Sequence, residues 1–299
     1  MFDVIIVGGS YAGLSAGLQL ARARRSVLVV DAGRRRNRFA AHSHGFLGSD
    51  GRSPEAIAAA GKADLLAYST VTWREGTVDA LRAEGSGFMA RVGAEEITAR
   101  RIILASGVVD ELPAIPGVGD RWGRTIFHCP YCHGYELDQG HIGVIASSPL
   151  AMHQGPLVAE WGAPGTTTLF LNGAFEPDPE QAAELRAHDV HVERSRVVAI
   201  GGDAPAVDVH LEDGRVVRKD GLFVMPRVHV DRRFAEALGC TLEDGPTGAF
   251  YATDVMKETN VPGVFACGDV ARPFGSVAIA VADGAMAGVA AHRSLVFRR

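Results

Sequence analysis

Phe2-Asp3-Val4-Ile5-Ile6-Val7-Gly8-Gly9-Ser10-Tyr11-Ala12-Gly13 is the stretch that decides the fold of this 299-residue chain. The apolar run Phe2 to Val7 predicts a buried parallel strand, and an apolar helix pattern follows from Leu14 to Leu20. A second strand, Ser26 to Val30, ends at Asp31, which lies about 20 residues past the glycine turn. This order of strand, glycine-rich turn, helix and strand is typical of a βαβ unit that binds a dinucleotide.

The turn of this unit predicts a phosphate site. Its glycines permit a tight bend and a close approach to a pyrophosphate, which the helix N-terminus then faces. Asp31 would accept hydrogen bonds from the adenosine ribose. Ser10 replaces the middle glycine of the usual pattern, so that Gly8-x-Ser10-x-Ala12 also looks like a degenerate hydrolase nucleophile elbow. A hydrolase would also need a suitably placed acid and histidine, and Asp31 lies where a ribose ligand belongs. The fingerprint alone does not separate FAD from NAD.

A second informative stretch is Cys129-Pro130-Tyr131-Cys132, followed by His133-Gly134-Tyr135-Glu136. Two cysteines at this spacing can close and reopen a tight disulfide. Pro130 suits a first helical position, and the unpaired N–H groups of a helix start stabilise a thiolate. A metal site that includes His128 and His133 is an alternative, although structural zinc usually takes its ligands from two separated knuckles. A second alternative is that the two cysteines form an inert structural pair. We favour a redox pair and expect no metal.

The composition excludes several classes of function. Hydrophobic residues make up 47% of the chain, and 30 basic and 35 acidic residues give a net charge of −5, without the broad basic footprint of a nucleic-acid-binding protein. No run approaches the roughly 20 apolar residues of a membrane span, and no targeting segment is evident, so we expect a cytoplasmic protein. Cys240 and Cys267 are expected to be small core residues. The basic run of Arg34-Arg35-Arg36 and Arg38 is either a solvated loop or a phosphate clamp.

Two later segments complete a pattern that begins with the glycine turn. Ala105-Ser106-Gly107 follows the strand Arg101 to Leu104, and Val264-Phe265-Ala266-Cys267-Gly268-Asp269 precedes a helix rich in small residues, Val277 to His292. With Gly8 to Gly13, these segments resemble the FAD-binding elements of the thioredoxin reductase family, in the same order and over nearly the whole chain. The resemblance implies an α/β fold with two Rossmann-like βαβ domains.

The resemblance also implies roles for particular residues. Asp269 would hold the flavin ribityl chain, and the helix start near Val277 would face the pyrimidine end of the flavin, which gains negative charge on reduction. Asn37 and His44 lie in or beside a segment, Arg38 to Gly45, that resembles a loop near the flavin. The positions assigned to FAD binding are Gly8, Gly9, Ser10, Tyr11, Ala12, Gly13, Asp31, Ala32, Arg36, Asn37, His44, Val78, Ala105, Ser106, Gly107, Gly268, Asp269, Val277 and Ala278.

The same resemblance divides the chemistry between the cysteines. Cys132 would face the flavin and Cys129 would meet the substrate. The family places an acid directly after the second cysteine, whereas this chain has His133 there and Glu136 one turn later. Because histidine titrates near neutrality, His133 can take a thiol proton. The alternative is that it only caps or packs the helix. We assign Cys129, Cys132, His133 and Glu136 as catalytic.

The resemblance also implies the domain order of the thioredoxin reductase family. Residues 1–112 and 229–299 would form a discontinuous FAD domain, and residues 113–228 would form a degenerate NAD(P)-binding-like domain that carries the cysteine pair. The prolines and glycine between Leu112 and Gly117 predict a linker. Strand-like stretches joined by Glu212-Asp213-Gly214 predict a hairpin with a type I′-like turn. By the resemblance, we expect a homodimer.

The departure from the family concerns NADPH. The strand His141 to Ile145 leads into Ala146-Ser147-Ser148-Pro149-Leu150-Ala151, where all the expected glycines are missing and Pro149 stiffens the turn. After the next strand, Asn172 to Glu176 contains no arginine or lysine for a 2′-phosphate. We therefore expect FAD to be bound and NADPH not to be bound.

A flavin–disulfide protein without NADPH needs another source of electrons. The segment Cys129 to Glu136 is similar to that of dithiol oxidases that close disulfides in microbial natural products such as holomycin, gliotoxin and romidepsin. This similarity implies that electrons pass from a small dithiol through the cysteine pair to FAD and then to O₂, giving H₂O₂. The alternatives are an NAD(P)H-dependent disulfide reductase and a flavin-bound redox sensor without turnover. No motif identifies the dithiol.

Overall fold

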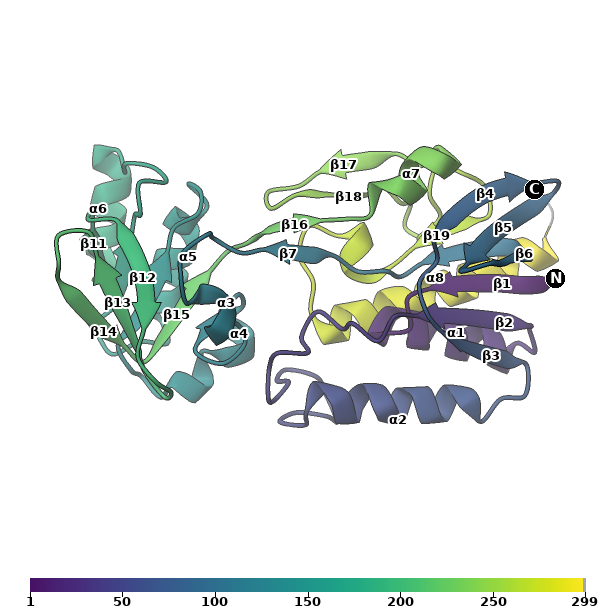
Figure 1. Ribbon diagram of the computed structural model, residues 1–299, viewed down its shortest axis with the longest axis horizontal. Helices are drawn as coiled ribbons and strands as arrows, with labels where there is room; N and C mark the ends of the chain where they lie inside the picture. Colours follow the sequence, from purple (N-terminus) through teal and green to yellow (C-terminus); the bar gives the residue numbers. More distant parts are fainter. Residues whose placement is uncertain (298–299) are drawn as a thin grey trace. The chain divides into compact units, whose positions relative to one another are not determined.

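The computed structural model describes residues 1–297 and divides the chain into two compact units. The first contains Met1–Arg36, Pro54–Val109 and the chain from Val228 onward, and the second contains Asn37–Ser53 and Asp110–Arg227. Each unit has its own sheet with flanking helices; the five-stranded sheet of the second unit is parallel, and that of the first is parallel except for β4 and β5, which pair antiparallel at one edge (Figure 1). The predicted α/β class with two Rossmann-like sheets is confirmed. From sequence order, residues 37–53 were expected in the FAD domain, whereas in the structure they group with the second unit.

The sheet of the first unit has the strand order β3-β2-β1-β6-β5-β4, and β19 also pairs with β6. β1 lies between β2 and β6 and is parallel to both, so its four residues from Val4 to Val7 are buried. This position is why the strand reads as a continuous apolar run. The strands of this sheet are β1 (Phe2–Val7), β2 (Val27–Asp31), β3 (Val71–Glu75), β4 (Ala80–Glu84), β5 (Gly87–Val92), β6 (Glu95–Leu104) and β19 (Val264–Ala266). A separate antiparallel pair is formed by β17 (Leu242–Asp244) and β18 (Ala249–Tyr251).

Helices cover one face of this sheet and a smaller helix lies on the other. α1 and α8 pack on the face formed by Val4 and Ile6, and α2 packs on α1 (Figure 1). α7 contributes Phe234 to the core on the opposite face, where Ile5 and Val7 point. The helices of this unit are α1 (Tyr11–Arg22), α2 (Pro54–Leu66), α7 (Arg232–Leu238), η2 (Gly268–Ala271) and α8 (Val277–Val296).

Glycines on α8 set how closely it approaches α1. A Cβ atom on Gly284 would lie 2.0 Å from the Ala12 carbonyl oxygen, and one on Gly288 would lie 2.5 Å from that of Ala16. Both distances are shorter than van der Waals contact, so only glycine permits this packing. The sequence showed a helix rich in small residues, and the structure gives the reason for it. The contact fixes the start of α1, where the nucleotide turn lies.

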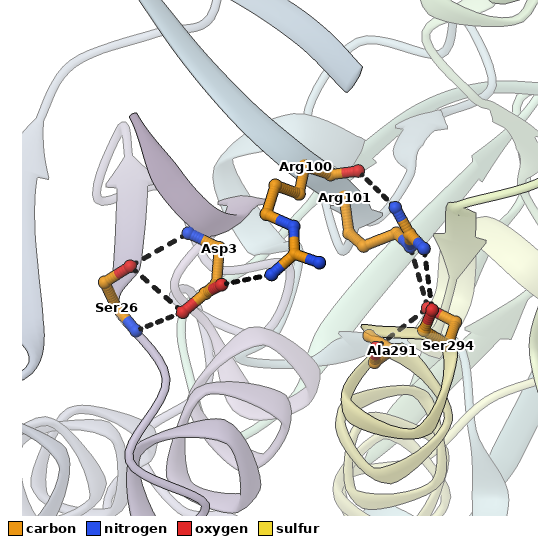
Figure 2. Close-up of polar contacts among 6 residues, drawn as sticks. All are labelled: Asp3, Ser26, Arg100, Arg101, Ala291 and Ser294. Carbon is orange, nitrogen blue, oxygen red and sulfur yellow. Dashed lines mark hydrogen bonds and ion pairs between the residues drawn. The ribbon is translucent and has the colours of Figure 1, made fainter. Parts of the chain in front are cut away.

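Polar contacts tie the beginning of β1 to β2 and β6 (Figure 2). Asp3 accepts hydrogen bonds from the backbone and hydroxyl of Ser26 and pairs with Arg100 at 3.1 Å. Arg101 donates to the carbonyl and hydroxyl oxygens of Ser294 near the end of α8, at 2.7 and 2.8 Å. Because C-terminal carbonyls of a helix lack intrahelical donors, this arginine satisfies one of them.

The second unit has a five-stranded parallel sheet, β11-β10-β9-β15-β8, and a three-stranded antiparallel sheet, β12-β13-β14. The chain passes between the units within β7 (Val109–Glu111) and β16 (Arg227–His229). The other strands are β8 (Ile126–Phe127), β9 (Ile142–Ile145), β10 (Thr168–Phe170), β11 (His191–Glu193), β12 (Val197–Gly201), β13 (Val207–Leu211), β14 (Val216–Lys219) and β15 (Gly221–Val224). The helices are α3 (Val118–Arg121), α4 (Pro130–His133), η1 (Tyr135–Leu137), α5 (Ala151–Ala159) and α6 (Pro179–Ala187).

The predicted hairpin is present as β13 and β14, but its turn differs from the prediction. Gly214 has a φ of +86°, whereas Asp213 is not among the residues with positive φ. The Gly214 amide donates to the Leu211 carbonyl at 3.0 Å. A type I′ turn needs positive φ at both central residues, so the type I′ prediction was wrong. The loop uses one left-handed glycine instead.

Candidate functional site

The glycine turn after β1 has the tight geometry that a pyrophosphate site needs. Gly8 has a φ of +101°, and a Cβ atom there would lie 2.3 Å from the Ala105 carbonyl oxygen. A Cβ atom on Gly13 would lie 1.9 Å from the Gly8 carbonyl oxygen. The Ser10 side chain makes no capping hydrogen bond at the start of α1, so it does not occupy the helix N-terminus. The turn thus provides a cradle of backbone into which a phosphate fits.

A cavity of about 470 Å³ opens beside this turn, within the first unit. Asp31 lines it and accepts a hydrogen bond from the Gly9 amide at 3.0 Å. Trp73 also lines it, and among residues 1–297 its indole Nε1 atom is buried without a hydrogen-bond partner. The cavity fits the adenosine half of FAD, since it offers an acid for the ribose, an aromatic wall and an unsatisfied donor. Its lining residues are Gly9, Asp31, Ala32, Gly33, Arg34, Arg35, Glu55, Ala58, Ala59, Lys62, Trp73, Glu75, Gly76 and Thr77.

Sequence reasoning did not identify Trp73 or Lys62. The Lys62 ammonium lies 4.2 Å from the centre of the Trp73 ring, and a Cβ atom on Gly9 would lie 2.2 Å from the same ring. Gly9 is therefore required by Trp73 as well as by a ligand. The available signal was an aromatic residue near the end of the third parallel strand, where the carboxyl ends of α/β strands bind ligands.

The arginine run has more than one role. Arg34 and Arg35 line the cavity, which supports the phosphate-clamp alternative over a purely solvated loop. Arg36 instead pairs with Asp269, with 2.9 Å between its Nη1 atom and the carboxylate. Gly275 lies so close to Asp269 that a Cβ atom would be 2.1 Å from Oδ1. Arg36 and Asp269, both assigned to the cofactor, are thus brought together from opposite ends of the sequence.

A buried ionic cluster missed by sequence reasoning supports this region. Asp283 on α8 is 3% exposed and receives hydrogen bonds from Arg272, one of them at 2.7 Å, while the Lys257 ammonium lies 3.1 Å away. Burial alone would raise the pKa of Asp283, but the two cations hold it below its ordinary value. Arg272 directly follows η2, which contains Asp269. The cluster therefore anchors η2 to α8.

The remaining residues assigned to FAD take varied positions. Val78 and Ala105 are buried, Ser106 is exposed, and Gly107 has a φ of +68°. Val277 and Ala278 begin α8, which Ser276 caps by accepting a hydrogen bond from the Ile279 amide. Asn37 and His44 belong to the segment that groups with the second unit.

The cysteine pair lies at the entrance to α4 in the second unit. Cys129 and Cys132 form a disulfide, with their Cα atoms 5.3 Å apart, and Pro130 occupies the first helical position as predicted. α4 is only one turn long, so its macrodipole is small and the local N–H groups are the available donors. Cys240 and Cys267 are buried, in line with core packing, and burial raises the pKa of Cys267 to about 12. Within residues 1–297, no group of three or more potential ligands is arranged to hold a metal ion.

His133 follows Cys132 directly, and its ring stacks on Phe127 with 4.4 Å between ring centres. Both ring nitrogens are buried, and neither makes a well-formed hydrogen bond to a residue in the described chain. Burial lowers the pKa of His133, against the opposing effects of the Glu136 carboxylate and the Cys129 carbonyl. The imidazole is therefore neutral near pH 7, the state in which it can accept a proton.

Glu136 faces a residue that the sequence assigned elsewhere. Its Oε1 atom lies 3.3 Å from Nε2 of His44, which comes from the segment 37–53. The structure thus brings His44, Glu136 and His133 into one electrostatic group beside the disulfide, since His44 and Glu136 both act on the pKa of His133. Sequence patterns gave no indication of this contact.

The second βαβ turn differs from the first in its backbone. None of residues 146–151 has a positive φ, whereas Gly8 in the first turn does. The Ser147 hydroxyl donates to the Met225 carbonyl at 2.6 Å, so a side chain fills the space that a glycine would leave open. The segment 172–176 itself contains no arginine, but the structure brings two arginines from elsewhere in the chain to the end of β10. Arg194 pairs with Glu176 at 2.8 Å, and Arg196 lies against Gly173.

Gly8→Ala is expected to cause most of the bound flavin to be lost and to cost about 1–3 kcal/mol of stability, since a positive φ and a backbone collision are both imposed. Flavin absorbance after desalting and thermal unfolding measure the two effects. Gly85→Ala is the matched control, because Gly85 also has a positive φ, of +59°, but nothing lies within 4 Å of its Cβ position. Full flavin occupancy in the Gly8 variant would contradict the cradle.

Comparisons with known proteins agree with this geometry. Residues 2–286 match the model of the pyridine nucleotide-disulphide oxidoreductase family. The thioredoxin reductase tcpT of Claviceps purpurea is 32% identical over 306 residues, covering 98% of this chain and 94% of that protein. A crystal structure of an oxidoreductase from Agrobacterium tumefaciens is 55% identical with a TM-score of 0.95, covering 100% of this chain and 99% of that one. The crystal structure of HlmI is 36% identical with a TM-score of 0.92, covering 99% and 92%.

Proposed function

The chain belongs to the pyridine nucleotide-disulphide oxidoreductase family, and on that premise we propose that it is an FAD-dependent dithiol oxidase. It is a flavin-dependent thiol/disulfide oxidoreductase of the thioredoxin reductase type, with the Cys129–Cys132 disulfide as its redox centre. The proposal adds the direction of electron flow. A small dithiol is the donor, dioxygen is the acceptor, and the products are a disulfide and hydrogen peroxide.

The observation that carries the proposal is the second βαβ turn. Ser147 is hydrogen-bonded to Met225, Pro149 follows, and the backbone lacks the left-handed residue found at Gly8. A nicotinamide dinucleotide thus has no backbone cradle in this turn, which supports a donor other than NADPH.

Within residues 1–297, no helix combines the length and apolar character of a membrane span.

The chain's own residues supply the thiol chemistry. A substrate thiolate attacks Cys129, which breaks the Cys129–Cys132 bond and leaves a thiolate on Cys132. The second substrate thiol then attacks the substrate sulfur of the mixed disulfide and releases Cys129. Two electrons pass to the cysteine pair, and neutral His133 accepts a proton released from the substrate. The glycine turn, Asp31 and Asp269 would hold FAD, which would supply the two-electron acceptor between the cysteine pair and dioxygen.

One observation favours the reductase alternative. Arg196 lies against Gly173 at the end of β10, with 3.2 Å between its Nη2 atom and the Gly173 Cβ position. A guanidinium in this region of a Rossmann-like domain can bind a 2′-phosphate. The missing glycines outweigh it, because the pyrophosphate must approach the backbone before the 2′-phosphate can reach an arginine.

Anaerobic mixing of the purified holoenzyme with three reductants tests the direction of electron flow. Dithiothreitol is expected to bleach the flavin rapidly, whereas NADPH and NADH at micromolar concentration are not. On readmission of air, peroxide should form in equal amount to the dithiol consumed. Rapid bleaching by NADPH would make the protein a reductase. Bleaching by the dithiol without sustained peroxide release would indicate a sensor without turnover.

The proposal extends to a homodimer. α8 leaves Ile279, Met286 and Val289 between 39 and 42% exposed, and their spacing places them along one side of the helix. An exposed apolar stripe of this kind supports self-association. Light scattering at micromolar protein is expected to give a molar mass of two chains, and a mass of one chain would refute the dimer without affecting the chemistry.

A further inference from the structure

Two aromatic side chains form an exposed surface beside the redox disulfide, within the second unit. Tyr131 lies between Cys129 and Cys132 in the sequence, and its side chain is 71% exposed. Its ring meets the ring of Trp161 edge to face, with 5.1 Å between ring centres and 85° between ring planes. We call these two side chains the aromatic platform. Because Tyr131 is two residues from Cys129, a thiol that attacks this cysteine arrives beside the platform.

The packing around α4 shows that the platform is built into the fold. A Cβ atom on Gly134 would lie 2.7 Å from Cγ and Cδ1 of Trp161, so only glycine lets the indole pack against the end of this helix. Gly134 has an ordinary helical φ of −70°, so glycine is needed here for space rather than for backbone conformation. His133 packs differently, since its ring nitrogens are buried and it stacks on Phe127. The exposed ring of Tyr131 is therefore the one available to a ligand.

The exposed charges near the platform are negative. Residues 125–185 contain no lysine or arginine. Glu136 lies in η1, Asp138 directly follows η1, and Glu160 directly precedes the platform tryptophan, and all three are exposed. Lys219 of β14 is only 5% exposed, and its ammonium donates to a backbone carbonyl at 2.7 Å. Because like charges disfavour binding, an anionic thiol is disfavoured here relative to an uncharged or cationic one.

We propose that the aromatic platform binds the body of the substrate, and that the substrate is a small, uncharged or cationic dithiol with a flat aromatic or heteroaromatic ring. This inference rests on the proposed function and deepens it by naming the substrate class. Aromatic rings attract one another in offset or edge-to-face arrangements, and they attract cations over their faces. Two side chains match the area of a single ring system, whereas a stable protein–protein interface buries at least about 1,200 Å² in total. The platform therefore fits a small molecule.

Two dithiols of matched thiol chemistry test the platform. Dithiothreitol and 1,2-benzenedimethanethiol both carry aliphatic thiols and both close to a six-membered cyclic disulfide, but only the second has an aromatic ring. In anaerobic bleaching of the holoenzyme, Tyr131→Ala is expected to raise the half-saturating concentration of 1,2-benzenedimethanethiol by about 5-fold, with the limiting rate unchanged. The same variant should leave both values for dithiothreitol unchanged. Tyr131→Phe keeps the ring and should behave like the unaltered protein.

A second measurement tests the charge preference. Dihydrolipoate is an anionic dithiol, so its half-saturating concentration should fall as salt is added, because salt screens the carboxylates near the platform. A half-saturating concentration that rises with salt would show attraction and would overturn the charge preference. Tyr135→Ala is the matched control for the platform variant, because Tyr135 is 85% exposed in the next turn but is not paired with Trp161. Bound FAD, measured by absorbance, should be unchanged in every variant.

Three outcomes would overturn the platform: an equal effect of Tyr131→Ala on both dithiols, no effect on either, or the same selective loss in Tyr135→Ala. An equal effect on both would assign Tyr131 to the geometry of the disulfide rather than to the substrate ring. Failure of the proposed function is distinguishable, because neither dithiol would then bleach the flavin of the unaltered protein.

Discussion

Cys132→Ser is expected to slow dithiol-driven flavin bleaching by more than about 10³-fold, because the disulfide that accepts the substrate's electrons can no longer form. Bound FAD should remain, since the cavity that fits its adenosine half lies in the first unit. Cys129 should still form a mixed disulfide with glutathione disulfide, which mass spectrometry of the intact chain would detect. That combination separates thiol exchange at Cys129 from electron passage through Cys132.

Cys129→Ser is the complementary variant. It should lose both mixed-disulfide formation and dithiol-driven bleaching while it keeps its flavin. Cys240→Ser is the matched control, because Cys240 is buried against Thr259 and belongs to the core of the first unit. Near-normal dithiol oxidation in either variant of the pair would show that Cys129 and Cys132 are not the relay.

His133→Ala is expected to lower turnover by about 10²-fold near neutral pH, the usual effect of removing a general base. The reason is the neutral state of the buried ring. Burial lowers the pKa of His133, so the proton-accepting form persists as pH falls through the ordinary titration range of histidine and is lost only below it. Turnover of the unaltered protein should therefore hold through that range and decline at lower pH. Stopped-flow measurement of flavin bleaching across pH checks both expectations.

The variant has a distinct signature if His133 acts as a base. Its defect should shrink at high pH, where thiols ionise without help. His133→Gln keeps a polar side chain of similar reach over Phe127 but cannot take a proton, so it should behave like the alanine variant. A pH-independent defect in the alanine variant, or a glutamine variant that works normally, would assign His133 to packing and shift the base to Glu136.

The sequence by itself determined the local units of this protein. The run from Phe2 to Gly13 specified a buried strand, a glycine turn and a helix, because strand burial and backbone crowding act over a few neighbouring residues. Pro130 marked the first position of the helix at the cysteine pair in the same way. The hairpin of β13 and β14 was predictable, but its turn type was not, because one positive φ at Gly214 serves as well as two. The sequence also showed directly that the second βαβ turn lacks the expected glycines.

Only the tertiary structure decided which distant side chains meet. Trp73 lies against Gly9, Arg36 pairs with Asp269, and Asp283 joins Arg272 to Lys257. His44 reaches Glu136 because residues 37–53 pack with the second unit rather than with β2 and α2, which flank them in sequence. Such contacts depend on strand order and on the path of loops, which no local periodicity encodes. Propensity and burial pattern act between near neighbours, whereas the charge environment of His133 is the sum of groups that folding gathers from across the chain.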